Sequence, residues 1–335
     1  MTAPDEQPAG YGATMPEAPP EAPLVSVVTP VHNEECHIEE CIESVLGQTY
    51  PHWEYTIVDN RSTDRTLAIA HEYADRDARI RVVAGDTFVP IIDSFNNAFR
   101  QVSSAATYCK VIGADDWMYP ECLGRMVELA EQDPDIAIVG AYWLSGSRVA
   151  PAGWPFEEPI VAGPDICRDY LLRERYFPMA PSPLLFRADI VRARQPFYRG
   201  RHLHTDAEAC FEILQQPHRF GFVPQILTFS RVRNESMTAH ARHLNTYIAQ
   251  RLYLLKSFGP NHLTAAELRE RIRAGLAEYY DFLASQVPRR RDRQFWAMHR
   301  ASLAELGHPL ALPRLGLNTV LYGTEELARR LRRKV

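Results

Sequence analysis

The sequence lacks several features that would assign a chain to one of the large protein classes. No apolar run approaches the roughly 18 residues of a membrane-spanning helix, and the start is not the basic and then apolar stretch of a signal peptide. Neither G-x-G-x-x-G nor a Walker sequence occurs, which argues against dinucleotide oxidoreductases and P-loop enzymes. Basic residues are not in excess either. The formal net charge is −5, so we do not expect a nucleic-acid binder.

The cysteines lack the spacing of a zinc site or a disulfide framework. The chain has six, and no two of them form a Cys-x-x-Cys pair. Several lie within apolar stretches, where a free cysteine behaves as a small buried side chain. We therefore expect free thiols in a reducing compartment and, with no predicted membrane span, a cytoplasmic protein.

The 335 residues contain enough apolar sequence, 46%, for a large core. Residues 1–23 are rich in Pro, Ala, Glu and Gly, and we expect a disordered tail there. Over 24–144, strand and helix patterns alternate, which predicts an α/β domain with a mainly parallel sheet. This rhythm breaks over 145–240, which we take as the second half of the same domain. Residues 241–335 carry helical periodicity and predict a helical C-terminal region.

The expected elements follow from apolar periodicity and from Gly, Pro and cap residues at their ends. Strands are expected over 24–30, 53–58, 80–83, 108–112, 136–143, 182–186 and 226–233. Helices are expected over 38–46, 67–74, 91–102, 117–132, 165–175, 204–214, 242–258, 264–285, 290–306 and 320–334. Residues 145–164, with their prolines and glycines, are expected to form a loop.

Carboxylates lie where two of the expected strands end. Asp59 ends the second strand, and Asp115 and Asp116 follow Gly113 and Ala114 after the fourth. The carboxyl ends of strands in an open α/β sheet form one ligand-binding rim. Two adjacent carboxylates repel unless they are solvated, hydrogen-bonded or bridged by a cation. The alternative is a solvated Asp-Asp loop that only caps the helix expected over 117–132.

These carboxylates fit a nucleoside diphosphate. An ionised Asp59 only accepts hydrogen bonds, so it suits the N3–H of uracil or thymine or the N1–H of guanine, whereas adenine fits poorly. A divalent metal on Asp116 would neutralise a diphosphate, and Asp115 could accept from a ribose hydroxyl.

Three segments of this sequence, 27–34, 57–66 and 113–116, resemble in order and spacing the nucleotide-binding segments of the family 2 glycosyltransferases. The resemblance covers about residues 24–235. It implies the GT-A fold, a Rossmann-like sheet flanked by helices, and an enzyme that transfers a sugar from a nucleotide donor with inversion. Many members carry an acidic residue two positions before the last aspartate of the third segment, whereas Ala114 stands there in this chain.

The resemblance also implies roles for individual residues. Asp115 would hold the ribose, and Asp116 would hold the metal, Mn²⁺ or Mg²⁺. Asn96 corresponds to an asparagine that the family carries at the start of the helix under the donor site. The residues that would surround the base are Thr29, Pro30, Val31, Asn33, Glu34 and Asp59.

The second half carries a candidate for the general base. An inverting transfer needs one base beside the acceptor hydroxyl, and the family places an acidic residue at the start of a late helix. Asp206 matches that place, and a helix N-terminus favours its ionised form. Glu208 is the alternative base, and a plain helix cap is the alternative role for Asp206. Arg231 and Arg233 match a basic strand end that could reach the leaving diphosphate, unless they are ordinary surface charges.

Together these features predict an inverting, metal-dependent glycosyltransferase that uses a UDP-sugar and a saccharide or lipid-linked saccharide acceptor. A nucleotidyltransferase or a catalytically inactive sugar-nucleotide-binding protein remains the alternative. Leu321, Leu327 and Leu331 lie on one side of the last expected helix, and five basic residues fall within 329–334. That helix could contact the cytoplasmic membrane face peripherally, or it could be a solvated basic tail.

Overall fold

The computed structural model describes residues 22–151, 158–200, 204–232, 241 and 243–332, with side chains up to residue 324. Nearly all of the expected tail, 1–23, lies outside this range. The elements of the first half are, in order, β1 (Val25–Val31), α1 (Ile38–Leu46), β2 (Trp53–Asp59), α2 (Thr66–Ala74), β3 (Ile80–Ala84), α3 (Ile91–Phe99), β4 (Tyr108–Val111), β5 (Trp117–Met118) and α4 (Cys122–Ala130).

The second half of the domain continues the same sheet. Its elements are β6 (Ile136–Ser145), β7 (Arg148–Ala150), β8 (Ile160–Ala162), α5 (Gly163–Arg173), β9 (Leu184–Arg187), α6 (Ala188–Ala193), α7 (Thr205–Leu214) and β10 (Arg219–Ser230). The strand order is β3-β2-β1-β4-β9-β6-β10-β5, with β7 added beside β6 and β8 beside β10. Strands β3, β2, β1 and β4 are parallel, and β9 runs antiparallel between β4 and β6.

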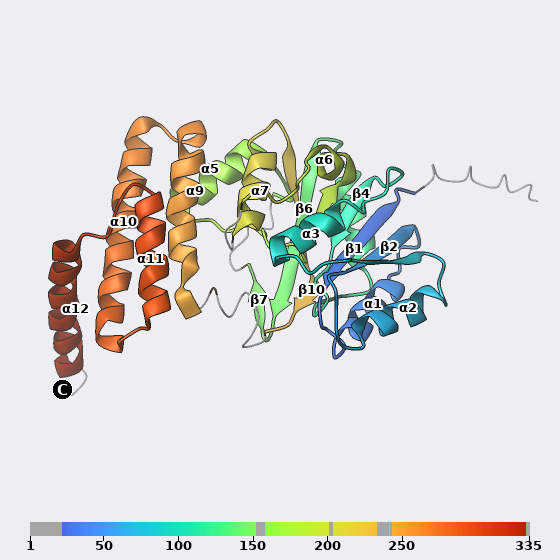
Figure 1. The fold of residues 1–335 in the computed structure, drawn as a ribbon. Helices are drawn as coiled ribbons and strands as arrows, with labels where there is room; N and C mark the ends of the chain where they lie inside the picture. Colours follow the sequence, from blue (N-terminus) through green and yellow to red (C-terminus); the bar gives the residue numbers. More distant parts are fainter. Residues whose placement is uncertain (1–21, 152–157, 201–203, 233–240, 242, 333–335) are drawn as a thin grey trace, which may run out of the picture.

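Helices cover both faces of this sheet because successive strand residues point to opposite sides (Figure 1). Val28 and Val111 face a core that includes residues of α3, α5 and α7. Val27 and Ile57 face a second core that includes residues of α1, α2 and α4. The predicted mainly parallel sheet flanked by helices is therefore confirmed, and β1, β2 and β4 are buried on both faces near their centre.

Three expectations about single elements were wrong. Residues 145–164 are not all loop, because β7 pairs with β6 and β8 pairs with β10. The helix expected over 117–132 begins only at Cys122. Trp117 and Met118 instead pair with β10, and the Trp117 ring stacks on Phe229 at 5.0 Å. Strand β10 begins at Arg219, not at residue 226, and so reaches alongside most of β6.

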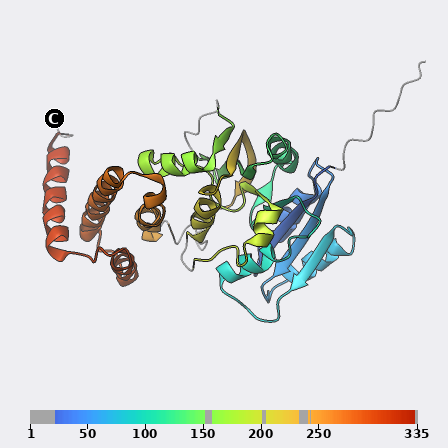
Figure 2. The same ribbon diagram turned by 90° about the horizontal axis from the view of Figure 1, so that it is seen from above.

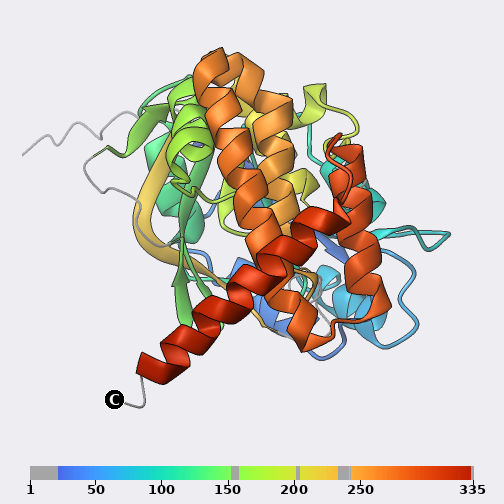
Figure 3. The ribbon, with the colours of Figure 1, turned by 90° about the vertical axis from the view of Figure 1, so that its left-hand side faces the viewer.

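The C-terminal region is helical, as predicted, and consists of α9 (Thr246–His262), α10 (Ala265–Gln286), the short 3₁₀ turn Val287–Arg289, α11 (Arg293–Glu305) and α12 (Leu312–Arg332). Helix α9 lies against α5 and buries Leu254 and Phe258 in the core that covers the sheet. The later helices extend away from it, and α12 crosses α10 at the far end of the molecule (Figures 2 and 3). No helix in the described part of the chain is long and apolar enough to cross a membrane.

All six cysteines carry free thiols, as expected. Five of them are buried, and Cys36 is exposed in the loop between β1 and α1. Burial raises the pKa of the Cys41 thiol to about 12, so this side chain stays neutral and packs as an apolar group.

Candidate functional site

The first two predicted segments meet at the rim of the sheet. Strands β1 and β2 pair with Val31 opposite Asp59, so both strands end at the same level. The Asp59 side chain is 2% exposed, and both of its oxygens accept from the Ser62 amide, at 3.0 and 3.3 Å. Asp59 also lines a cavity of about 130 Å³ together with Gly85 and Ser94. This carboxylate is therefore held in place beside a space that opens at the rim.

Thr29, Pro30 and Val31, which the resemblance places around the base, are the last three residues of β1. Thr29 is fully buried, and its hydroxyl accepts a hydrogen bond of 2.9 Å from the Tyr55 hydroxyl. The Val31 carbonyl accepts from the Asn60 amide at 2.7 Å. These three side chains are thus part of the packed sheet, and the loop itself starts at His32.

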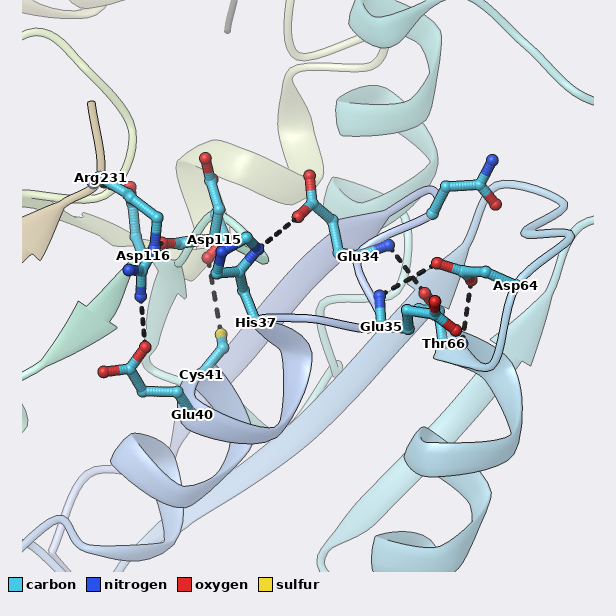
Figure 4. A network of polar contacts seen from close by, with 12 residues as sticks. Glu34, Glu35, His37, Glu40, Cys41, Asp64, Thr66, Asp115, Asp116 and Arg231 are labelled. Atoms are coloured by element: carbon cyan, nitrogen blue, oxygen red, sulfur yellow. Dashed lines mark hydrogen bonds and ion pairs between the residues drawn. The ribbon is translucent and has the colours of Figure 1, made fainter. Parts of the chain in front are cut away.

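Asn33 and Glu34 connect this loop to the segment after Asp59, and Figure 4 shows the contact of Glu34 with Thr66. The Asn33 amide donates to the Ser62 hydroxyl at 2.9 Å, and the Asn33 side-chain oxygen accepts from the Thr63 amide at 2.7 Å. The Glu34 amide donates to the Thr66 hydroxyl at 2.7 Å, while the Glu34 carboxylate pairs with His37. The two predicted segments therefore form one hydrogen-bonded rim.

The Asp116 carboxylate is partly buried and accepts hydrogen bonds from three donors. Its Oδ2 accepts from the hydroxyls of Ser182, at 2.5 Å, and Ser230, at 3.1 Å. Its Oδ1 accepts from the Arg231 amide at 3.1 Å. Burial, and then the neighbouring charge of Asp115, raise the pKa of Asp116 to about 7. The hydrogen bonds from Ser182, Arg231 and Ser230 offset this rise only in part.

The donor set fits a divalent cation that is shared with a ligand. No group of three or more His, Cys, Asp or Glu side chains in the described residues could hold a metal on its own. Mg²⁺ and similar ions are, however, usually held by one or two carboxylates and by substrate phosphates. A carboxylate offers about four lone-pair positions, and the three donors on Asp116 leave one of them. Asp116, with Asp115 beside it, therefore suits such an ion.

Arg231 closes one side of this pocket. Its guanidinium forms an ion pair with Glu40 of α1, and its Nε donates to the Asp115 carbonyl at 3.3 Å. Figure 4 shows Arg231 and Glu40 beside Asp116, at the end of α1 that also carries Cys41. Arg233 lies outside the described residues.

Asp206 lies in the first turn of α7, as predicted, and is partly exposed. Its Oδ1 accepts from the Ala207 amide at 2.8 Å. Burial, and then the Asp206 charge, raise the pKa of Tyr198, which places this carboxylate near the Tyr198 ring. Glu208 accepts a hydrogen bond from the Tyr253 hydroxyl of α9, so it is tied to the C-terminal helices.

Asn96 is not at the start of its helix, because it lies in the middle of α3. The side chain is 3% exposed. Its Nδ2 donates to the Tyr198 carbonyl at 2.9 Å, and its Oδ1 accepts from the Tyr198 amide at 2.7 Å. These bonds occupy the side-chain amide with the backbone of Tyr198, so Asn96 fixes the segment before α7.

Three residues at this site were not predicted from the sequence, namely Ser182, Ser230 and Lys110. The two serines reach Asp116 from positions 66 and 114 residues further along the chain. No local pattern marks either of them. Lys110 did carry a signal, since a lysine in the middle of an apolar strand is unusual, and it is fully buried behind the site.

Comparison with known proteins finds one family model over the first half of the domain. The model of glycosyl transferase family 2 matches residues 26–174. Residues of this chain are 52% identical over 152 positions to a putative teichuronic acid biosynthesis glycosyltransferase, TuaG, of Bacillus subtilis, covering 45% of this chain and 58% of TuaG. They are 37% identical over 127 positions to an uncharacterized glycosyltransferase, EpsJ, of B. subtilis, covering 38% of this chain and 36% of EpsJ. The chain thus spans only part of these relatives.

Solved structures share the fold at low sequence identity. TarS 1–349 of S. aureus, solved in complex with UDP-GlcNAc, has a TM-score of 0.62 and 16% identity, covering 84% of this chain and 80% of that one. The mannosyltransferase PcManGT of Pyrobaculum calidifontis, solved with GDP-Man and Mn²⁺, has a TM-score of 0.55 and 18% identity, covering 91% of this chain and 80% of that one. The rim segments, the GT-A fold and the family match agree, and residues 26–174 form a glycosyl transferase family 2 domain.

Proposed function

We propose that this chain transfers a sugar from a nucleotide-diphosphate donor, a UDP-sugar, to a saccharide or lipid-linked saccharide acceptor, with inversion at the anomeric carbon. The observation that carries this proposal is the shared rim of Asp59 and Asp116. One is a fixed acceptor beside a cavity, and the other is a partly buried carboxylate whose pKa is raised to about 7. A base and a diphosphate-bound cation are what such a pair would recognise.

In this proposal Asp59 accepts from the N3–H of uracil, and Asp115 accepts from a ribose hydroxyl. Thr29, Pro30 and Val31 form the floor under the base, and Asn33 and Glu34 hold the rim segments together. Asp116 holds Mn²⁺ or Mg²⁺, which when bound neutralises the diphosphate of the donor. Arg231 supplies a positive charge beside that diphosphate once its ion pair with Glu40 is broken. Arg233 is the second candidate for this role. The structures of relatives in fold that contain UDP-GlcNAc, or GDP-Man with Mn²⁺, support these assignments.

The general base in this proposal is Asp206. The acceptor oxygen attacks the anomeric carbon from the side opposite the diphosphate, and its proton passes to the Asp206 carboxylate. The position of Asp206 in the first turn of α7 supports this role, because the helix N-terminus favours the ionised form. Glu208 is the weaker candidate, because the Tyr253 hydroxyl donates to it. An inactive protein or a nucleotidyltransferase would not need a base at this position.

We further propose that α12 contacts the cytoplasmic face of a membrane peripherally, where a lipid-linked acceptor would lie. Leu317, Val320 and Leu321 of this helix are 61%, 66% and 54% exposed. The sequence that follows contains five basic residues within 329–334, and each contributes about 1 kcal/mol beside an anionic bilayer. The exposed apolar residues and the charge support weak, salt-sensitive attachment.

The test of the proposed function is a nucleotide screen by thermal denaturation with and without Mn²⁺. UDP with Mn²⁺ is expected to stabilise the fold by about 2.7 kcal/mol at a hundredfold excess over Kd. ADP is the matched control, because adenine presents an acceptor where Asp59 needs a donor. A shift with ADP, but none with UDP, GDP or dTDP, would contradict the role of Asp59. Release of UDP from a UDP-sugar only when an acceptor mixture is present would separate a transferase from an inactive binding protein.

A further inference from the structure

Lys110 is a fully buried lysine in β4, directly behind the Asp116 loop. Its Nζ donates to the carbonyl of Ser182 and, at 3.1 Å, to the carbonyl of Leu184. Burial lowers the pKa of Lys110, while the charge of Asp116 acts in the opposite direction. A buried ammonium is costly unless it is paired and hydrogen-bonded. Lys110 therefore draws residues 182–184, where β9 begins, against the first half of the sheet.

Ser182 connects this lysine to the carboxylate. It is 4% exposed, and its hydroxyl donates to Asp116 Oδ2 at 2.5 Å. The same hydroxyl accepts from the Gly113 amide at 3.2 Å, which fixes the direction in which it donates. Ser182 thus uses its carbonyl for Lys110 and its hydroxyl for Asp116. The segment has no freedom to turn the serine away without breaking one of these contacts.

We propose that Lys110 and Ser182 are positioning residues that hold the Asp116 carboxylate in the orientation in which it binds a divalent cation. This inference rests on the proposed metal role of Asp116. Ser182 and Ser230 both occupy Oδ2, whereas Oδ1 takes only the Arg231 amide and keeps an open lone-pair position. The two serine hydroxyls therefore leave Oδ1, rather than Oδ2, available to a cation. Groups that orient a metal-binding side chain in this way typically change metal affinity 10- to 100-fold when they are removed.

The experiment measures the Kd of Mn²⁺ directly, from the EPR signal of the free ion at saturating UDP. Ser182→Ala is expected to raise this Kd about 10- to 100-fold. Ser182→Thr, which keeps a hydroxyl, should restore it to within about 3-fold of the wild-type value. Ser26→Ala removes an equally buried serine of β1 that does not contact Asp116, and it should leave the Kd unchanged.

Asp116→Ala distinguishes a failure of the proposed metal role from a failure of the positioning role. If Asp116→Ala does not weaken Mn²⁺ binding, the proposed metal role itself is wrong. If Asp116→Ala weakens it and Ser182→Ala does not, only the positioning role is wrong. Lys110→Met should weaken Mn²⁺ binding as Ser182→Ala does, and the double variant should be no weaker than Ser182→Ala alone, because both act through one segment. Additive effects would overturn the connection through Lys110, and if Lys110→Met does not fold, the two Ser182 variants still decide the matter.

Discussion

Replacing Asp116 by asparagine should make the metal-free protein more stable at neutral and alkaline pH. Asparagine has nearly the same shape, and the hydroxyl of Ser230 can rotate to accept from its side-chain amide. The substitution removes the negative charge of the carboxylate, which the metal-free fold partly buries. The same substitution should abolish Mn²⁺ binding, so stability and the proposed function are expected to change in opposite directions.

The size and sign of this effect follow from the pKa of Asp116, which rises from 3.8 to about 7 on folding. A raised pKa means that folding favours the protonated form of Asp116. The contribution of this protonation to the stability of the fold is complete below pH 3.8 and is lost as the pH rises to about 7. Each pKa unit corresponds to about 1.4 kcal/mol, which sets an upper limit of roughly 4 kcal/mol for the gain in the variant above pH 7. Near pH 4 the two proteins should unfold with similar free energies.

Urea denaturation in the presence of EDTA measures this difference, at pH 4.5 and pH 8. The variant should unfold at a higher urea concentration at pH 8, with the gap nearly closed at pH 4.5. In UDP and Mn²⁺ at pH 8 the order should reverse, because only the wild-type protein gains from the ion. The reasoning would be refuted by a variant that is less stable than the wild type at pH 8 in EDTA, or by a gap that does not change with pH.

Asp206→Asn should lower turnover by about 10²–10⁴ while the Kd of UDP stays the same, whereas Glu208→Gln should retain most activity; a normal rate in Asp206→Asn would refute its role. Asn96→Ala should reduce the free energy of unfolding in urea by about 1–3 kcal/mol, since it leaves the buried backbone of Tyr198 unpaired. A raised Kd for UDP at unchanged stability would instead favour a nucleotide contact. Truncation after Leu321 should reduce pelleting with anionic liposomes at low salt, and equal pelleting would exclude α12 as an anchor.

The sequence predicted the rim of the site because that rim depends on a general rule. Parallel strands end at one edge, so Asp59 and Asp116 could be brought together from strand patterns alone. The contacts of Asp116 could not be predicted in this way. They depend on β9 running antiparallel beside β4 and on β10 running beside β6, and these pairings join residues far apart in the chain.

The errors have the same origin. Strands β7 and β8 are short, and each is stabilised by pairing with a neighbouring strand rather than by its own composition. The proline and glycine residues around them therefore led to the prediction of a loop. Trp117 follows an Asp-Asp pair in a sequence that favours a helix, yet its ring finds a stacking partner in Phe229, more than a hundred residues away. Tertiary contacts overrode local preference at both places.

The contacts of Asp116 also connect the two substrate sites that we propose. Its three donors come from Ser182, Ser230 and Arg231, all in the half of the domain that would carry the acceptor, while the carboxylate comes from the half that would carry the nucleotide. A sugar-nucleotide that binds through the Asp116 carboxylate would alter its hydrogen bonds to residues beside β9 and at the end of β10. Coupling between two sites is reciprocal, so an acceptor bound beside those residues would also alter Asp116. We therefore expect a bound sugar-nucleotide to change the Kd of the acceptor, and a bound acceptor to change the Kd of the sugar-nucleotide by the same factor.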